Sequence, residues 1–168
     1  DECTSGFRQC LGGLHKLVNV NPDMAIFGKA LGNGYAITAV LGKKSIMDSA
    51  RKSFISSTFW SDRIGPVAAL KTLEIMEREK SWKKINYLGE KVFLIWKKLS
   101  KKHNLKINIS GLPSLAKFSF DSKNSQAYKT YITQEKLKNK FLAANGVYLS
   151  TSNDEKILKK YSENLDEI

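Results

Sequence analysis

The most constraining stretch of this chain covers residues 22–35 and reads PDMAIFGKALGNGY. Its first part, Asp23 to Phe27, is a short apolar run between turn-forming residues, which favours a buried β-strand over a helix. Gly28 and Lys29 follow directly, and further glycines come soon after. Open α/β sheets bind their ligands at strand ends, and glycine lets a ligand approach the backbone closely. A lysine held there is a candidate amine nucleophile toward carbonyl compounds.

This stretch matches neither of two common phosphate-binding motifs. A P-loop requires glycine where Asp23 stands and Ser or Thr where Ala30 stands. A dinucleotide fingerprint requires its third glycine where Ile37 stands. A single Gly-Lys pair is also compatible with a surface lysine in a glycine-rich turn. The interpretation of Lys29 therefore depends on the rest of the chain.

The first eight residues, DECTSGFR, place a carboxylate and a thiol two positions apart. In an extended strand, Asp1 and Cys3 point to the same face, ahead of a turn at Gly6. We expect the chain to begin inside a strand, with no signal or transit peptide. The alternative interpretation of Asp1 is a solvated terminal acid.

Residues 1–8 and 22–34 together resemble the class III (subgroup II) aminotransferases, and among them the glutamate-1-semialdehyde 2,1-aminomutase-like proteins. These are pyridoxal-phosphate enzymes with the α/β fold called fold type I. The resemblance implies that Asp1 pairs with the pyridine nitrogen of pyridoxal 5'-phosphate, that Lys29 forms a Schiff base with its aldehyde, and that Cys3 packs against its ring. A carboxylate keeps that nitrogen protonated, which strengthens the cofactor as an electron sink. The lysine is displaced by the substrate amine and then carries protons.

A third segment with this resemblance is FISSTFW at residues 54–60. The resemblance implies that Thr58 reaches across a homodimer interface to the cofactor phosphate of the other subunit. A hydroxyl and nearby backbone N–H groups suit phosphate oxygens. The family has Asn-Pro soon after this threonine, whereas here five residues, SDRIG, intervene before Pro66. Ser57 and Ser61 therefore stay open as alternatives to Thr58, and so does a structural turn rich in Ser and Thr.

The resemblance also implies a domain organisation. We expect residues 1–80 to be the C-terminal part of the cofactor-binding large domain, residues 81–104 to be a linking helix, and residues 105–168 to be a small C-terminal α/β domain. The chain would then be the C-terminal half of a longer enzyme. We expect this half to bind the cofactor poorly by itself, because the phosphate loop and the stacking aromatic residue would lie upstream.

Hydrophobic periodicity predicts the regular elements beyond Phe27. Strands are expected at residues 36–42, 106–110, 115–120 and 147–150, and helices at 45–52, 66–78, 82–103, 125–144 and from about 154 to the end. The apolar stripe of the long helix consists of Trp82, Ile85, Leu88, Val92, Ile95 and Leu99. Asn145 and Gly146 signal the end of a helix, and Asn153 or Asp154 is expected to cap the last one.

The charge is unevenly distributed along the chain. Residues 1–80 carry 11 Lys and Arg against 8 Asp and Glu, whereas residues 81–168 carry 17 against 8. This basic half raises an alternative, a nucleic-acid-binding or other interaction module, but no helix-turn-helix, zinc-finger or RNA-binding signature accompanies it. Two cysteines without a second pair do not indicate a zinc site. No apolar segment is long enough to cross a membrane, and we expect a cytoplasmic protein.

The sequence therefore predicts part of a pyridoxal-phosphate-dependent aminotransferase or aminomutase. Its partners would be a small-molecule amino donor, a keto or aldehyde acceptor, and a second copy of the chain in a homodimer with a shared active site. Whether the amino group moves between two molecules or within one stays open. A non-catalytic fragment that acts only in interactions is the second interpretation.

Overall fold

The computed structural model describes all of residues 1–168, which divide into two compact units. The first unit is Asp1–Lys83 and the second is Lys84–Ile168. Each has its own hydrophobic cluster of buried side chains, so each is described by itself.

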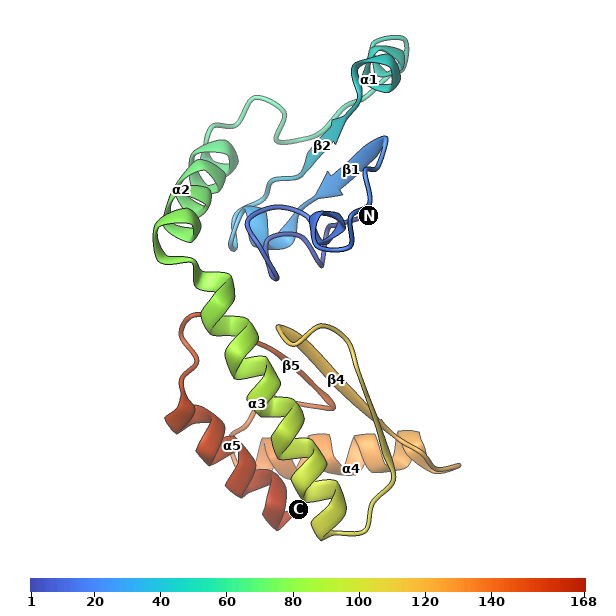
Figure 1. Ribbon diagram of the computed structural model, residues 1–168, viewed down its shortest axis with the longest axis vertical. Helices are drawn as coiled ribbons and strands as arrows, with labels where there is room; N and C mark the ends of the chain where they lie inside the picture. The colour runs from blue at the N-terminus through green and yellow to red at the C-terminus, as the bar shows by residue number, and fades with distance from the viewer. The chain divides into compact units, whose positions relative to one another are not determined.

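The first unit is built around a two-stranded antiparallel sheet. Strand β1 (Met24–Phe27) lies beside β2 (Ala39–Gly42), as Figure 1 shows. Phe27 is paired with Ala39. The small core beneath the sheet contains Ala25, Phe27, Leu31 and Ala69. The elements of this unit are η1 (Leu14–Lys16), β1 (Met24–Phe27), η2 (Lys29–Leu31), β2 (Ala39–Gly42), α1 (Lys44–Ala50) and α2 (Ile64–Glu79).

Three expectations for the first unit need correction. The strand at β1 is confirmed, but Met24 and Ile26 are exposed, because the sheet is covered on one face only. Residues 1–3 do not form a strand, since the chain turns from Cys3 onward. The second strand is shorter than predicted and begins at Ala39. Helix α2 is confirmed, and it leaves Val67 and Leu70 exposed.

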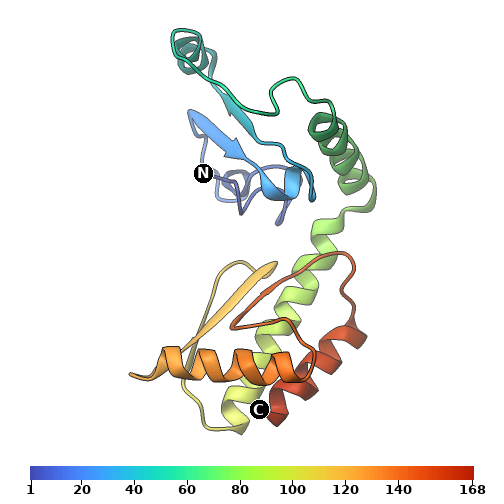
Figure 2. The ribbon, with the colours of Figure 1, turned by 180° about the vertical axis from the view of Figure 1, so that it is seen from behind.

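The second unit is a three-stranded antiparallel sheet with helices packed on it. Its strand order is β3-β4-β5. Figures 1 and 2 show α3 and α5 side by side, and both supply side chains to the core. The elements are α3 (Ser81–Lys102), β3 (Ile107–Ser110), β4 (Leu115–Phe120), α4 (Ser125–Lys138), β5 (Gly146–Tyr148) and α5 (Glu155–Glu167).

Helix α3 forms because its apolar residues recur every three or four positions and fill the core of the second unit. The predicted stripe is confirmed at Ile85, Leu88, Val92 and Leu99, which are buried. The prediction omitted Trp96, which is only 2% exposed. Its ring meets Phe118 edge-on at 4.8 Å between centroids, an arrangement that aromatic pairs prefer.

The ends of the last two helices follow from their capping residues. Helix α4 stops at Lys138, six residues before the predicted end at 144. Lys140 adopts a left-handed φ of 65° and the Phe141 N–H donates to the Lys136 carbonyl at 2.8 Å, which is a Schellman-type end. Asp154 caps α5 as predicted, since its Oδ1 accepts a hydrogen bond from the Ile157 N–H at 2.8 Å. No helix combines the length and the apolar character that a bilayer span requires.

Candidate active site

Lys29 lies directly after the end of β1, in a tight turn. Gly28 is extended with φ −165°, and Lys29 adopts a left-handed φ of 44°. The turn is closed by hydrogen bonds of 3.0 Å from the Leu31 N–H to the Gly28 carbonyl and from the Asn33 N–H to the Lys29 carbonyl. Left-handed backbone is uncommon for a residue with a side chain, and such positions cluster at functional sites. The turn presents an exposed lysine at the strand end.

The Lys29 amine is held by a hydroxyl group. Its Nζ donates a hydrogen bond to Thr4 Oγ1, so a neutral oxygen and not a carboxylate is its partner. Without an ion pair to break, this amine is available to a carbonyl compound.

Cys3 and Asp1 lie next to this turn. A Cβ atom built on Gly28 would be 2.9 Å from Cys3 Sγ, so the thiol packs against the backbone at a position where only glycine fits. Asp1 Oδ1 accepts a hydrogen bond from the Cys3 N–H at 2.8 Å, and the Asp1 side chain is exposed. Asp1, Cys3 and Lys29 are thus brought together at the end of β1.

The structure also shows a buried carboxylate that the sequence analysis missed. Glu2 is 8% exposed. Its Oε2 accepts a hydrogen bond from Ser5 Oγ, and its Oε1 accepts one from the His15 N–H at 2.9 Å and lies 3.1 Å from His15 Nδ1. Burial raises the pKa of Glu2, but hydrogen bonds from Ser5, His15 and Leu14 outweigh that effect and hold the pKa below its ordinary value.

A signal for Glu2 was present in the sequence. Side chains alternate along extended backbone, so a residue between Asp1 and Cys3 is expected to point the opposite way, toward the interior. A carboxylate there requires hydrogen-bond donors, and Ser5 is within reach along the chain. Thr4 was less predictable, because its contact with Lys29 joins residues 25 positions apart.

Thr58 is not part of this cluster within the chain. It lies exposed in the segment that joins α1 to α2. The Trp60 N–H donates to the Ser57 carbonyl at 3.3 Å in the same turn. Ser57 and Ser61 are exposed as well, so the geometry does not favour one of the three hydroxyl groups.

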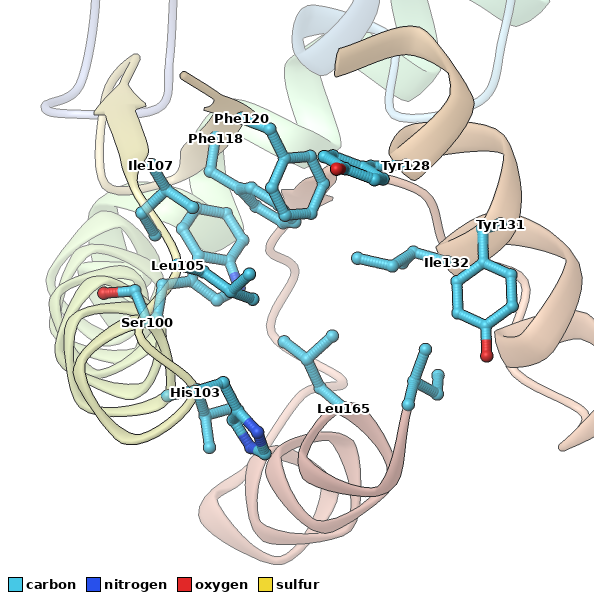
Figure 3. A pocket seen from close by; sticks show the side chains of 13 residues that line it. Ser100, His103, Leu105, Ile107, Phe118, Phe120, Tyr128, Tyr131, Ile132 and Leu165 are labelled. Atoms are coloured by element: carbon cyan, nitrogen blue, oxygen red, sulfur yellow. The ribbon is translucent and has the colours of Figure 1, made fainter. Parts of the chain in front are cut away.

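The second unit contains a separate cavity of about 320 Å³ (Figure 3). Its walls are mostly apolar and aromatic, with Phe118, Phe120 and Tyr128 on one side and Leu165 on another. His103 lines it too, but its Nε2 lies 2.8 Å from Asp166 Oδ1 and is already paired. The cavity is therefore a mostly apolar space whose histidine is already paired.

Comparison with known proteins agrees with this arrangement. The sequence model of the family described as aminotransferase class III matches residues 1–160. The chain belongs to the class III aminotransferases. The family resemblance predicted from residues 1–8 and 22–34 is thereby confirmed, and the cofactor of this family is pyridoxal phosphate.

Curated class III relatives are longer than this chain. A 3-aminobutyryl-CoA aminotransferase from Cloacimonas acidaminovorans is 40% identical over 135 residues, which cover 80% of this chain and 33% of the relative. A glutamate-1-semialdehyde 2,1-aminomutase from Sulfolobus acidocaldarius is 34% identical over 174 residues, covering 96% of this chain and 40% of the relative. The chain thus spans between a third and two fifths of these two proteins.

Solved structures confirm the predicted fold type I. The FumI protein of Sphingopyxis sp. MTA144 matches 99% of this chain with a TM-score of 0.90, at 23% identity and over 41% of its own length. Acetylornithine aminotransferase from Elizabethkingia anophelis matches 99% of this chain with a TM-score of 0.83, at 22% identity and over 43% of its length. At such identities the likeness supports the fold alone.

Proposed function

We propose that the full-length protein is a pyridoxal-phosphate-dependent aminotransferase or aminomutase in which Lys29 binds the cofactor covalently. The observation that carries the proposal is the Lys29 turn. It combines left-handed backbone, an exposed amine and a hydroxyl as the partner of that amine.

The residues around Lys29 fit this cofactor chemically. A primary amine is the group that bonds to an aldehyde, and Asp1 supplies a carboxylate whose Oδ1 alone is engaged within the chain. The absence of a side chain at Gly28 leaves Cys3 Sγ lying against the backbone beside Lys29, where it would face a flat ring. Asp1, Cys3 and Lys29 would therefore hold the cofactor.

When bound, pyridoxal phosphate supplies an electron sink for negative charge at the substrate carbon. Asp1 would hold a proton on the pyridine nitrogen through its carboxylate charge. Lys29 would hold the aldehyde end and, once a substrate amine has replaced it, take up and return a proton at Nζ. The Thr4 hydroxyl would orient that amine.

We further propose that the enzyme is a cytoplasmic homodimer and that Thr58 of one subunit contacts the cofactor phosphate of the other. Large apolar side chains around Thr58 support an interface there, since Phe54 is 96% exposed and Trp60 is 70% exposed. In this proposal, residues 1–80 belong to the cofactor-binding domain, 81–104 form a linking helix and 105–168 form the small domain.

The substrates would be a small-molecule amino donor and a keto or aldehyde acceptor. The two curated relatives bear different reaction names, an aminotransferase and an aminomutase, and the proposal includes both reactions. The comparisons do not favour the nucleic-acid-binding alternative.

The test uses the full-length protein with pyridoxal phosphate. We expect a visible absorption band of covalently bound cofactor, and borohydride reduction should fix the label on Lys29 in a peptide found by mass spectrometry. Lys29→Ala should remove both. Lys43→Ala is the matched control, because Lys43 lies in the same unit and pairs with Asp23 at 2.6 Å. A label on a different lysine, or none in the unmodified protein, would contradict the proposal.

A further inference from the structure

Thr4, whose hydroxyl holds the Lys29 amine, lies in a short segment that also contains the buried Glu2 and its partner Ser5. We propose that Glu2 is a positioning residue of the active site and that it acts on Lys29 through Thr4. This inference rests on the proposed role of Lys29 as the cofactor-bearing residue.

The first contacts fix Glu2 itself. Its carboxylate receives hydrogen bonds from Ser5 and His15, and its own N–H donates to the Ile26 carbonyl in β1 at 2.8 Å. Hydrogen bonds to a charged group are stronger than those between neutral groups. Glu2 is therefore bonded to the loop at His15 by its side chain, and to strand β1, which precedes Lys29, by its backbone.

Two glycines show how closely the surroundings pack on Glu2. A Cβ built on Gly13 would lie 2.3 Å from His15 Nδ1 and 3.0 Å from Glu2 Oε1. A Cβ built on Gly6 would lie 2.7 Å from the Glu2 carbonyl oxygen and 2.7 Å from Phe27 Cδ1. The segment from residue 2 to residue 6 is thus clamped between the loop and the end of β1.

Thr4 lies inside this clamped segment. Its carbonyl accepts a hydrogen bond from Arg8 Nε at 3.0 Å, and the Gly6 N–H donates to the Glu2 carbonyl at 2.8 Å. The Thr4 hydroxyl then accepts the hydrogen bond from Lys29 Nζ. A lysine side chain has several rotatable bonds and loses much entropy when it is fixed, so an acceptor that is already immobile places the amine at a lower cost.

The test measures how fast full-length apoprotein bonds pyridoxal phosphate to Lys29. We expect Glu2→Gln and Thr4→Val each to slow this attachment about tenfold, which is the usual size for one hydrogen bond to a charged group. If Glu2 acts through Thr4, the double variant should also be slowed by only about tenfold, because residues in one network are not additive. Thr4→Ser, which keeps the hydroxyl, should restore the rate to within about twofold.

A second measurement needs no cofactor. Acetic anhydride labelling of the apoprotein, read by mass spectrometry, should modify Lys29 faster in Thr4→Val and Glu2→Gln, because the amine is no longer held by the hydroxyl. If the role of Glu2 were purely structural, Glu2→Gln would lower stability, but it would not both slow cofactor attachment and speed acetylation of Lys29. Thr130→Val is the control, since it removes a hydroxyl bonded to the Gln126 carbonyl at 3.0 Å in the other unit, and it should change neither rate.

The outcomes separate this inference from the proposed function. A double variant slowed about a hundredfold would mean independent effects and would overturn the path through Thr4. Unchanged attachment and labelling in folded single variants would overturn the positioning role. If Thr4→Val or Glu2→Gln does not fold, Thr4→Ala or Glu2→Asp takes its place under the same criteria. Failure of the proposed function is distinct, because the unmodified protein would then bond no cofactor to Lys29. The acetic anhydride labelling would still test whether Glu2 and Thr4 hold the Lys29 amine.

Discussion

The two units of the chain differ in how much apolar surface they bury. In the second unit, ten buried residues form one cluster. In the first, the corresponding cluster has four, namely Ala25, Phe27, Leu31 and Ala69. Exposed apolar side chains are frequent in the first unit and include Phe54, Trp60, Val67 and Leu70. The unit that carries Lys29 therefore exposes more large apolar side chains than the other, which supports the dimer interface proposed above.

The two units are also stabilised by different kinds of contact. The second unit has a continuous series of aromatic contacts, with 4.8 Å between the ring centroids of Trp96 and Phe118, 5.5 Å between Phe118 and Phe120, and 5.3 Å between Phe120 and Tyr128. The first unit relies on hydrogen bonds to a buried carboxylate at Glu2 and on close backbone approach. Apolar packing stabilises the second unit, whereas polar contacts organise the first. Four substitutions test this contrast.

The largest effect is expected at the centre of the second core. Trp96→Ala should lower the free energy of unfolding by about 3 to 5 kcal/mol, because it removes a buried ring and leaves a cavity. Leu17→Ala in the first unit is the control and should change stability by less than about 0.5 kcal/mol, since Leu17 is largely exposed. Urea denaturation followed by far-ultraviolet circular dichroism measures both. Equal losses would mean that the two units do not differ in this way.

The second effect concerns a lysine buried in the same core. Lys136 is fully buried, and its Nζ donates to the Ala144 carbonyl at 3.1 Å and to Tyr161 Oη at 3.3 Å. Burial lowers the pKa of Lys136 from 10.5 to about 8. Between these two pH values the unfolded chain binds more protons than the folded one. The free energy of unfolding should therefore rise with pH in that window, by up to about 1.4 kcal/mol per pH unit.

Lys136→Met keeps the side-chain volume and removes the titrating group. Its free energy of unfolding should lack this rise between pH 8 and pH 10.5, and at pH 7 it should exceed that of the unmodified protein by about 2 kcal/mol, because no charge is buried. Urea denaturation at pH 7.5 and at pH 10 measures the slope. A slope that persists in the variant would assign the titration to a different group.

The third effect is expected in the first unit at the opposite end of the pH scale. The pKa of Glu2 lies below 4.5 in the folded protein, so its stabilising contribution is complete above that pH and is lost as the pH falls through the folded value. Glu2→Gln should cost about 1 to 2 kcal/mol at pH 7 and should reduce the acid sensitivity of the first unit. Hydrogen exchange from pH 7 to pH 3 measures this effect at two amides, that of residue 2, which donates to the Ile26 carbonyl, and that of His15, which donates to the carboxylate. If hydrogen exchange did not change at low pH, Glu2 would not contribute to the stability of the first unit.

The smallest effect is expected at a helix cap. Asp154→Ala removes the acceptor for the Ile157 N–H and should cost about 1 kcal/mol. Ser152→Ala, an exposed neighbour, is the control and should change stability by less than about 0.5 kcal/mol. Thermal unfolding of both variants gives the comparison. A loss at Ser152 equal to that at Asp154 would mean that the cap does not hold the start of α5.

Local patterns predicted most of the regular structure correctly. The stripe of α3, the strands β3 and β4 and the cap at Asp154 all follow from periodicity and side-chain chemistry that act within a few residues. The predicted end of α4 was wrong, because the left-handed position after the helix is occupied by Lys140 and not by glycine or asparagine. The roles of Asp1, Cys3, Lys29 and Thr58 stay predictions, and the borohydride experiment above tests that of Lys29.

The family and its cofactor could be predicted without a structure, because residues 1–8 and 22–34 contain a short, specific pattern of side chains around Lys29. The sequence by itself also determined where helices and strands form. The partners of the Lys29 amine and of the Glu2 carboxylate are visible only in the folded chain. The contacts of Thr4 with Lys29 and of Glu2 with His15 join residues 25 and 13 positions apart, and no local periodicity records them. They form because folding brings a clamped N-terminal segment against the end of β1.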